Sequence, residues 1–264
     1  MYKAYMLDEN EIFALISDYP DEAIYPPIVD DKQLKNNLRK LMFHALETNT
    51  ALKASTLWDS FFPCTDIPVF LSHSSQDKTV VRKLANYLYR EFGIISFIDS
   101  DLWGCIQDLQ VEIDKKFCLQ PGKQHTYDYD DRNYSTAHTH MILSYALTRM
   151  INQSECFIFL KSDNSVAIND SIEGTFSPWI FHELITVDTI EIIRPDRIDD
   201  ELAKSIESSV KLFSEQRLKV HYPIPCRRLL HLSSRMLNSL EKMSLPKNTN
   251  YKRWELYLNS LYEL

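Results

Sequence analysis

Ser72, His73 and Ser74 stand where a ligand-binding loop of an α/β protein would lie. They follow an apolar run over residues 67–71 and precede a helical pattern over 77–91, which predicts a strand, a polar loop and a helix. In open α/β sheets, ligands bind at the carboxyl ends of strands. The hydroxyls and backbone N–H groups of this loop could bind a phosphate, or the segment could simply be a turn that caps the helix, with Ser75 or Asp77 as the cap.

Glu183 is the candidate catalytic carboxylate. Ser177 is a favourable N-cap and Pro178 suits the first helical position, so a helix is predicted over 177–187. Trp179 lies four residues before Glu183, which places an indole beside the carboxylate at the border of the apolar face. Such a carboxylate can stabilise a cationic transition state or attack it. The alternative is an ordinary surface glutamate next to a core tryptophan.

Asp99 and Trp103 follow a second predicted strand over 94–98. Side chains that follow neighbouring parallel strands meet at one edge of the sheet. Asp99 could therefore accept hydrogen bonds from sugar hydroxyls, and Trp103, predicted to lie in a loop, could stack on a base. The alternative is a solvated acidic turn with one anchoring aromatic side chain.

The pattern of elements predicts an α/β fold, a flavodoxin-like doubly wound parallel sheet with an N-terminal helical extension. Core strands are expected at 67–72, 94–98, 156–160 and 218–222, while 190–193 could be a short strand or a helix end. Helices are expected at 77–91, 140–151, 177–187 and 227–243. The predicted organisation is a helical extension over 1–62, an α/β domain over 63–245 with a long insert at about 104–136, and a helical tail over 246–264.

Composition excludes several classes of protein. The 264 residues carry a formal charge of −8, which argues against nucleic acid or an anionic membrane as partner. Four glycines disfavour Gly-rich dinucleotide and phosphate loops. No apolar run approaches the ~18 residues of a membrane span, so a cytoplasmic protein is expected. The five cysteines are scattered, which favours reduced thiols, and no residues have metal-ligand spacing, so no metal is expected.

Four segments, in this order, resemble the Toll/interleukin-1 receptor (TIR) domain, bacterial type. Val69-Phe-Leu-Ser-His73 resembles the first strand of that family, and Phe92-Gly-Ile-Ile-Ser-Phe-Ile-Asp99 its second strand. Ser154–Ser162 resembles its third strand, and Ser177-Pro-Trp-Ile-Phe-His-Glu-Leu184 resembles its "S.W...EL" helix. The resemblance covers about residues 67–225.

For members that have this glutamate, the resemblance implies cleavage of NAD. The nicotinamide of NAD is already cationic and leaves as a neutral molecule, so a single carboxylate suffices, whereas most glycosidases need two. The chain would then be an NAD glycohydrolase or ADP-ribosyl cyclase in bacterial antiviral defence, with NAD as substrate and no cofactor. Its expected partners are other copies of the chain in a homo-oligomer, and a downstream effector or a phage-derived trigger. The alternatives are a non-catalytic TIR scaffold and a related Glu-dependent nucleoside N-glycosidase.

Two features depart from the family pattern. The insert at about 104–136 stands where relatives have a short loop, and it includes Tyr127-Asp-Tyr-Asp-Asp-Arg132. We expect an extended loop here, which could cover the site, pair internally through Arg132, or contact a neighbouring protomer. In addition, Ser74 and Ser75 replace the basic or aromatic residue that usually follows the first strand.

Overall fold

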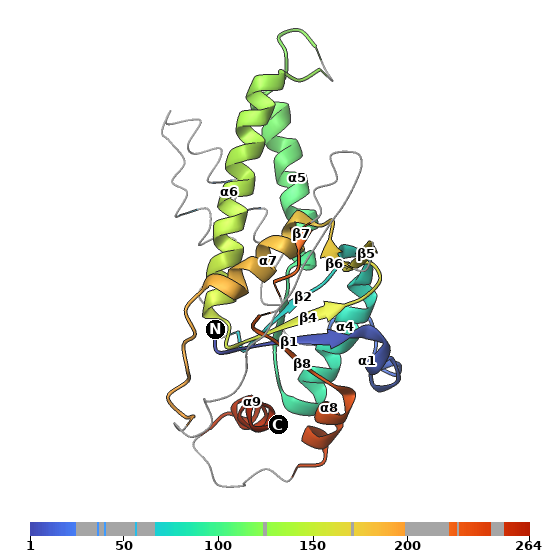
Figure 1. Ribbon diagram of the computed structural model, residues 1–264. Helices are drawn as coiled ribbons and strands as arrows, with labels where there is room; N and C mark the ends of the chain where they lie inside the picture. Colours follow the sequence, from blue (N-terminus) through green and yellow to red (C-terminus); the bar gives the residue numbers. More distant parts are fainter. Residues whose placement is uncertain are drawn as a thin grey trace. The chain divides into compact units, whose positions relative to one another are not determined.

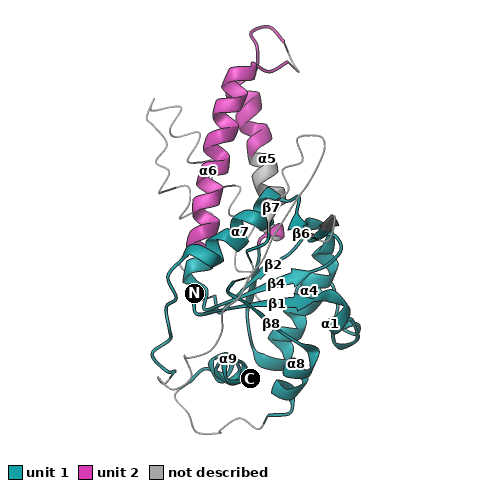
Figure 2. Ribbon diagram, viewed as in Figure 1, with its two compact units in different colours: residues 1–26, 66–98, 151–264 teal, residues 27–65, 99–150 magenta. Residues whose placement is uncertain are grey.

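The structure of the protein is a computed structural model in which the chain forms two compact units (Figure 2). Unit 1 comprises residues 1–26, 66–98 and 151–264, and unit 2 comprises 27–65 and 99–150. The structure describes residues 1–24, 36, 40, 56, 67–123, 126–169, 172–198, 222–225, 227–243 and 251–264. None of the helices in these ranges combines the length and apolar content needed to cross a bilayer.

Five parallel strands form the main sheet of unit 1. They are β1 (Lys3–Asp8), β2 (Val69–Ser72), β3 (Ser96–Ile98), β4 (Cys156–Lys161) and β8 (Leu229–His231), in the spatial order β3-β2-β4-β1-β8 (Figure 1). The strands β2 and β4 are almost continuously apolar because both of their faces are buried. This sheet confirms the predicted α/β, flavodoxin-like class.

The two faces of the sheet pack against different partners. Val69 and Leu71 point into a core shared with helices α1 (Glu9–Ile16), α4 (Lys78–Tyr87), α8 (Ser234–Glu241) and α9 (Arg253–Glu263). Phe70 points to the opposite face, where its ring stacks on Phe157 at 5.6 Å between centroids. Because side chains alternate along a strand, Ser72 lies on the Phe70 face.

The prediction of a helical extension over residues 1–62 is wrong for its first segment. Lys3–Asp8 is strand β1, inserted between β4 and β8 in the interior of the sheet. Only Ala4, Tyr5 and Leu7 of this strand are buried, and so short a pattern does not distinguish a strand from the start of a helix in the sequence. The partners of β1 lie more than 140 residues away, so only tertiary pairing reveals it. The segment 25–62 lies outside the described residues, apart from three single positions.

The last core strand is also displaced from its predicted position. Residues 218–221 lie outside the described part of the chain, and Tyr222–Pro223 forms β7 in a small antiparallel sheet with β5 (Ala167–Asn169) and β6 (Ile172–Thr175). The fifth parallel strand is β8, within the predicted helix 227–243. The helix there, α8, begins only at Ser234. The segment 190–193 is neither strand nor helix, since helix α7 (Pro178–Thr189) ends before it.

The insert at 104–136 is a helical hairpin and not the extended loop we expected. Helix α5 (Ser100–Phe117) and helix α6 (Tyr129–Gln153) are joined by a turn in which Asp128 N donates to Cys118 O at 2.6 Å. Asp128 begins α6 by accepting from the backbone N–H groups of Asp130 and Asp131. The expected internal pairing through Arg132 is present, because its guanidinium lies over the ring of Tyr127 at 5.4 Å.

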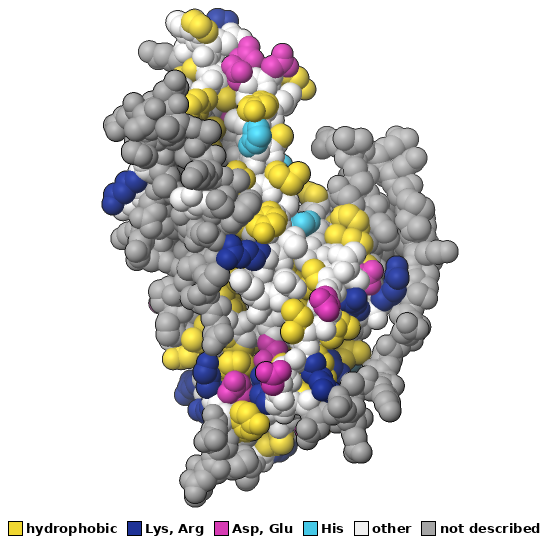
Figure 3. Space-filling model, turned by 90° about the vertical axis from the view of Figure 1, so that its left-hand side faces the viewer, with side chains coloured by type: hydrophobic (Ala, Val, Ile, Leu, Met, Phe, Trp, Pro, Cys, Tyr) yellow, Lys and Arg dark blue, Asp and Glu magenta, His cyan; other side chains and the backbone are white. Residues whose placement is uncertain are grey.

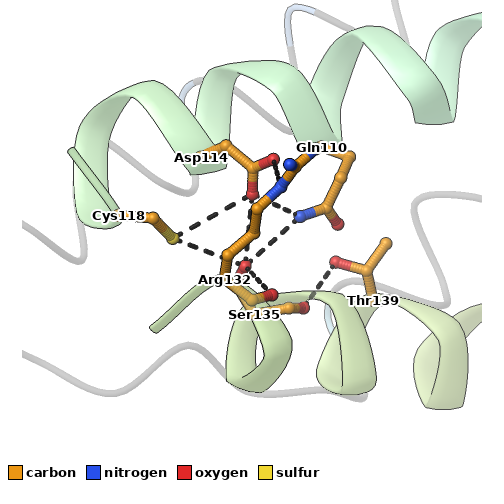
Figure 4. Close-up of polar contacts among 6 residues, drawn as sticks. All are labelled: Gln110, Asp114, Cys118, Arg132, Ser135 and Thr139. Atoms are coloured by element: carbon orange, nitrogen blue, oxygen red, sulfur yellow. Dashed lines mark hydrogen bonds and ion pairs between the residues drawn. The ribbon is translucent and has the colours of Figure 1, made fainter. Parts of the chain in front are cut away.

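A polar cluster joins the two helices of the hairpin (Figure 4). Its centre is Asp114, buried on α5, whose Oδ2 accepts from Arg132 Nε at 2.9 Å. Asp114 Oδ1 accepts from Gln110 Nε2 at 2.7 Å and from Ser135 Oγ at 3.3 Å. Cys118 Sγ lies 3.6 Å from Ser135 Oγ. One carboxylate thus satisfies donors from both helices and sets their register.

Leu7→Ala tests whether β1 belongs to the core. Leu7 is fully buried, so its truncation is expected to cost about 2–5 kcal/mol in the free energy of unfolding, measured with urea. Phe13→Ala is the control, because Phe13 on α1 is 67% exposed and should change stability by about 0.5 kcal/mol or less. Equal, small effects for both variants would contradict the placement of β1.

Asp114→Ala is expected to loosen the hairpin by roughly 1–3 kcal/mol, because it leaves donors on both helices without their acceptor. Hydrogen exchange resolved by peptide should then accelerate across α5 and α6. Lys115→Ala removes an exposed neighbour on the same helix and serves as the control. Unchanged exchange in Asp114→Ala would show that the cluster does not hold the hairpin together.

Candidate active site at the carboxyl edge of the sheet

Ser72 and Glu183, separated by 111 residues in sequence, are joined by a hydrogen bond. Ser72 Oγ donates to Glu183 Oε2 at 2.5 Å. Both side chains are buried, with Glu183 only 1% exposed. A hydrogen bond to a carboxylate in such an environment is charge-assisted and orients the acceptor strongly. The two residues predicted from separate segments therefore form one site.

The local sequence explains how α7 positions Glu183. Ser177 caps the helix by accepting from Ile180 N at 3.3 Å, and Pro178 occupies the first turn, as predicted. Ile180 and Leu184 are buried on the inner side of the helix. Glu183 lies between these positions and reaches the last residue of β2, on the sheet face that also carries Phe70.

The rest of the 72–74 loop is buried and structured. His73 is 4% exposed, and its Nδ1 lies 3.4 Å from the carbonyl oxygen of Leu71. Ser74 is the N-cap of a short 3₁₀ helix, Ser75–Asp77, and its hydroxyl accepts from Gln76 N at 3.4 Å. The segment is a capping turn, but the capping hydroxyl belongs to Ser74 and not to Ser75, and Asp77 precedes α4 without a capping hydrogen bond from its side chain. Binding of a phosphate by this loop stays a prediction.

Trp179 is half-buried on α7, one turn before Glu183. Its indole meets the ring of His182 edge-on, with 6.5 Å between centroids. His182 was not among the candidates from sequence, although its place next to Glu183 could have drawn attention to it. The α7 segment therefore presents an indole and an imidazole beside the buried carboxylate.

Asp99 and Trp103 belong to unit 2. Asp99 directly follows β3, as predicted, and it is buried, so the alternative of a solvated acidic turn is wrong for this residue. Trp103 was expected in a loop, but it lies in helix α5, which begins at Ser100. A helix starts here because the chain leaves the sheet directly into the hairpin. The Trp103 side chain is outside the described part of the structure, so its stacking role stays a prediction.

A second buried carboxylate at the carboxyl edge was missed from sequence. Asp77 is 3% exposed, and its two oxygens accept from Ser162 Oγ at 2.5 Å and Asn164 Nδ2 at 2.6 Å. These residues follow β4, so the network ties the end of β2 to the end of β4. The signal available in sequence was Ser162-Asp-Asn-Ser165, a cluster of side chains that bond to nearby backbone, directly after a predicted strand.

The neighbouring end of β1 adds further negative charge. Burial raises the pKa of Glu9, and the carboxylates of Asp77, Asp163 and Asp8 raise it further. This edge of the sheet favours cationic groups and hydrogen-bond donors over anions. Within the described residues, no three His, Cys, Asp or Glu side chains are grouped so that they could hold a metal ion.

The described cysteines do not provide a nucleophile. Cys118 and Cys156 are free and buried. Burial raises the pKa of the Cys156 thiol, and the carboxylate of Glu155 raises it further. A thiol in this state is rarely ionised and reacts slowly. Among the buried side chains described here, Glu183 remains the group best placed for nucleophilic or electrostatic catalysis.

Comparison with known proteins adds no further assignment. No protein-family model, curated protein or solved structure matches this chain. The resemblance to TIR domains rests on the four sequence segments alone and stays a prediction. The candidate site is defined by its geometry, in which Ser72 and Glu183 meet at the carboxyl end of β2.

Asp77→Ala tests the network that ties β2 to β4. It removes an acceptor with two short hydrogen bonds, so the free energy of unfolding should fall by about 2–4 kcal/mol. Asp163→Ala is the matched control, since Asp163 is an exposed aspartate in the loop after β4 that Asp77 contacts. Chemical denaturation measures both variants, and a loss no larger than that of the control would mean that Asp77 is not a structural link.

Proposed function

We propose that this protein cleaves the N-glycosidic bond between nicotinamide and ribose in NAD, with Glu183 as the catalytic carboxylate. The observation that supports this proposal is the hydrogen bond from Ser72 to Glu183 at the carboxyl end of β2. A buried carboxylate held by a donor at the ligand-binding edge of a parallel sheet is costly to maintain, and such groups cluster at functional sites.

The proposed reaction breaks the bond between ribose C1′ and the pyridinium nitrogen. The bonding electron pair moves to the ring, so nicotinamide leaves neutral and needs no proton from the protein. Positive charge develops on C1′ and the ring oxygen of the ribose, and the Glu183 carboxylate either stabilises that charge or forms a bond to C1′. Water then forms a bond to C1′ and releases its proton to solvent, or an adenine nitrogen forms that bond in cyclisation, and any bond from Glu183 to C1′ breaks in the same step.

Ser72 would be a positioning residue in this scheme. Its hydroxyl donates to one oxygen of the Glu183 carboxylate and so fixes the orientation of that group. Preorganised charge in a site that excludes water acts more strongly than the same charge in water. Since Glu183 is 1% exposed, NAD has to displace part of the cover over this carboxylate before it can react.

The acidic surroundings favour the cationic half of the substrate. Carboxylates are gathered around the ends of β1 and β2, and after burial the neighbouring Asp77, Asp163 and Asp8 contribute to the raised pKa of Glu9. The nicotinamide ring of NAD carries a positive charge, and its ribose offers hydroxyl donors. The half-buried indole of Trp179, one turn before Glu183, is a suitable surface for a flat cationic ring.

Asp77 supports a second candidate function, a nucleoside N-glycosidase. That chemistry usually uses a second acid, and Asp77 is a buried carboxylate after the same strand, β2. Its two hydrogen bonds to the β4 loop favour a structural role. NAD therefore remains the first proposal, and nucleosides are the comparison substrates.

Glu183→Gln is expected to lower the rate of nicotinamide release by roughly 100-fold or more, because it removes the charge and keeps the volume. Purified protein is incubated with NAD, and nicotinamide, ADP-ribose and cyclic products are separated by chromatography. Parallel incubations with adenosine and inosine test the nucleoside alternative. Glu191→Gln, an exposed glutamate just after α7, is the control.

The result separates the possible functions. Loss of NAD cleavage in Glu183→Gln, with full activity in Glu191→Gln and an unchanged circular dichroism spectrum, supports the proposal. A folded Glu183→Gln variant with the wild-type rate would contradict it. Release of free base from nucleosides but not nicotinamide from NAD would replace it with the second candidate.

A further inference from the structure

Helix α6 carries a stripe of exposed side chains that the proposed function does not use. Tyr134, His138, Met141 and Tyr145 recur at helical spacing of four, three and four residues, so they lie on one face. Tyr134 and Met141 are 71% and 70% exposed, and Tyr145 is 48% exposed. In Figure 3, hydrophobic and histidine side chains gather along the exposed side of this helix. We call these four residues the α6 stripe.

The α6 stripe is not part of the core of the hairpin. In the part of α6 that belongs to unit 2, residues 129–150, the buried side chains lie on the opposite face, about half a helical turn away. They are Thr139, Leu143, Ala146, Leu147 and Met150. A helix that is apolar on two opposite faces has a second packing surface, and exposed apolar surface of this kind marks interaction sites.

The α6 stripe includes an ordered aromatic pair. The rings of Tyr134 and His138 pack edge to face, with 4.4 Å between centroids and an interplanar angle of 70°. Tyrosine and methionine are enriched where proteins meet, because they bury large area with an adaptable or amphipathic surface. An ordered aromatic pair loses less conformational entropy on binding than separate side chains would.

Charge at the two ends of the same face is complementary. Asp130 lies one turn before Tyr134 and is exposed, and Arg149 lies one turn after Tyr145. The face therefore has an acidic start, an apolar centre and a basic end, over about 29 Å of helix. Suppose that a second α6 packs antiparallel, with the two-fold axis passing between Thr139 and His140 of each copy. Asp130 of one copy then meets Arg149 of the other, and Tyr134 meets Tyr145.

We propose that the α6 stripe binds the same stripe of a second copy of this chain, in an antiparallel arrangement. The self-complementary order of charges and aromatic side chains suits an isologous two-fold interface, in which each contact occurs twice. Nucleic acid does not fit this face, because its centre carries no lysine or arginine and one end is acidic. The proposal is independent of the chemistry at Glu183.

Met141→Glu places a carboxylate at the centre of the α6 stripe, next to the two-fold axis. Sedimentation equilibrium of the full chain should show a dimer for the wild type and a dissociation constant raised at least about tenfold in Met141→Glu. Phe13→Glu is the matched control, because Phe13 is 67% exposed on α1 and should leave the dimer intact. Circular dichroism confirms that both variants are folded.

Exchanging the charges of Asp130 and Arg149 tests the antiparallel register. Asp130→Arg alone brings two arginines together at each end of the interface and should weaken the dimer. Asp130→Arg combined with Arg149→Asp reverses the pair and should restore most of the wild-type dissociation constant.

A wild-type chain that stays monomeric up to 200 µM would overturn the proposal. So would a dimer that Met141→Glu leaves intact, or one that Phe13→Glu weakens equally. If the double exchange binds no more tightly than the single reversal, the antiparallel arrangement is wrong.

Discussion

Strand β4 pairs along both of its edges, and most of unit 1 depends on that pairing. β1 matches it over all six residues, from Lys3 with Cys156 to Asp8 with Lys161, and β2 matches it over four. A strand that is buried on both faces and paired on both edges leaves no backbone group exposed to water. The carboxyl ends of β1, β2 and β4 are thereby brought to one edge, where the polar side chains have to find partners.

Asp77 and Glu183, two of the buried carboxylates described near this edge, have different partners. Asp77 accepts from two side chains of the loop after β4, and so acts as a link between strands. Glu183 accepts from Ser72 and comes from α7, an element outside the sheet. Glu183 thus links α7 to the end of β2, and its catalytic role stays a proposal.

In the hairpin of α5 and α6, as at the sheet edge, a buried carboxylate links two elements of secondary structure. One buried carboxylate, Asp114, gathers donors from both helices, while apolar side chains of α6 pack on the same side. This leaves the opposite face of α6 available for the α6 stripe. The internal polar cluster (Figure 4) and the exposed stripe thus occupy different faces of a single helix, one structural and one proposed for binding.

The sequence by itself determined the features that depend on local pattern. Apolar runs located β2, β3 and β4, and Ser177 with Pro178 located the start of α7, so Ser72 and Glu183 were identified as candidates without a structure. Tertiary structure alone decided that β1 enters the sheet, that β8 is its fifth strand, and that Ser72 and Glu183 touch. The physical reason is that a short strand is defined by its hydrogen-bonded partners, and those partners lie far away in sequence. The hydrogen bond between Ser72 and Glu183 likewise forms only when α7 packs against the sheet.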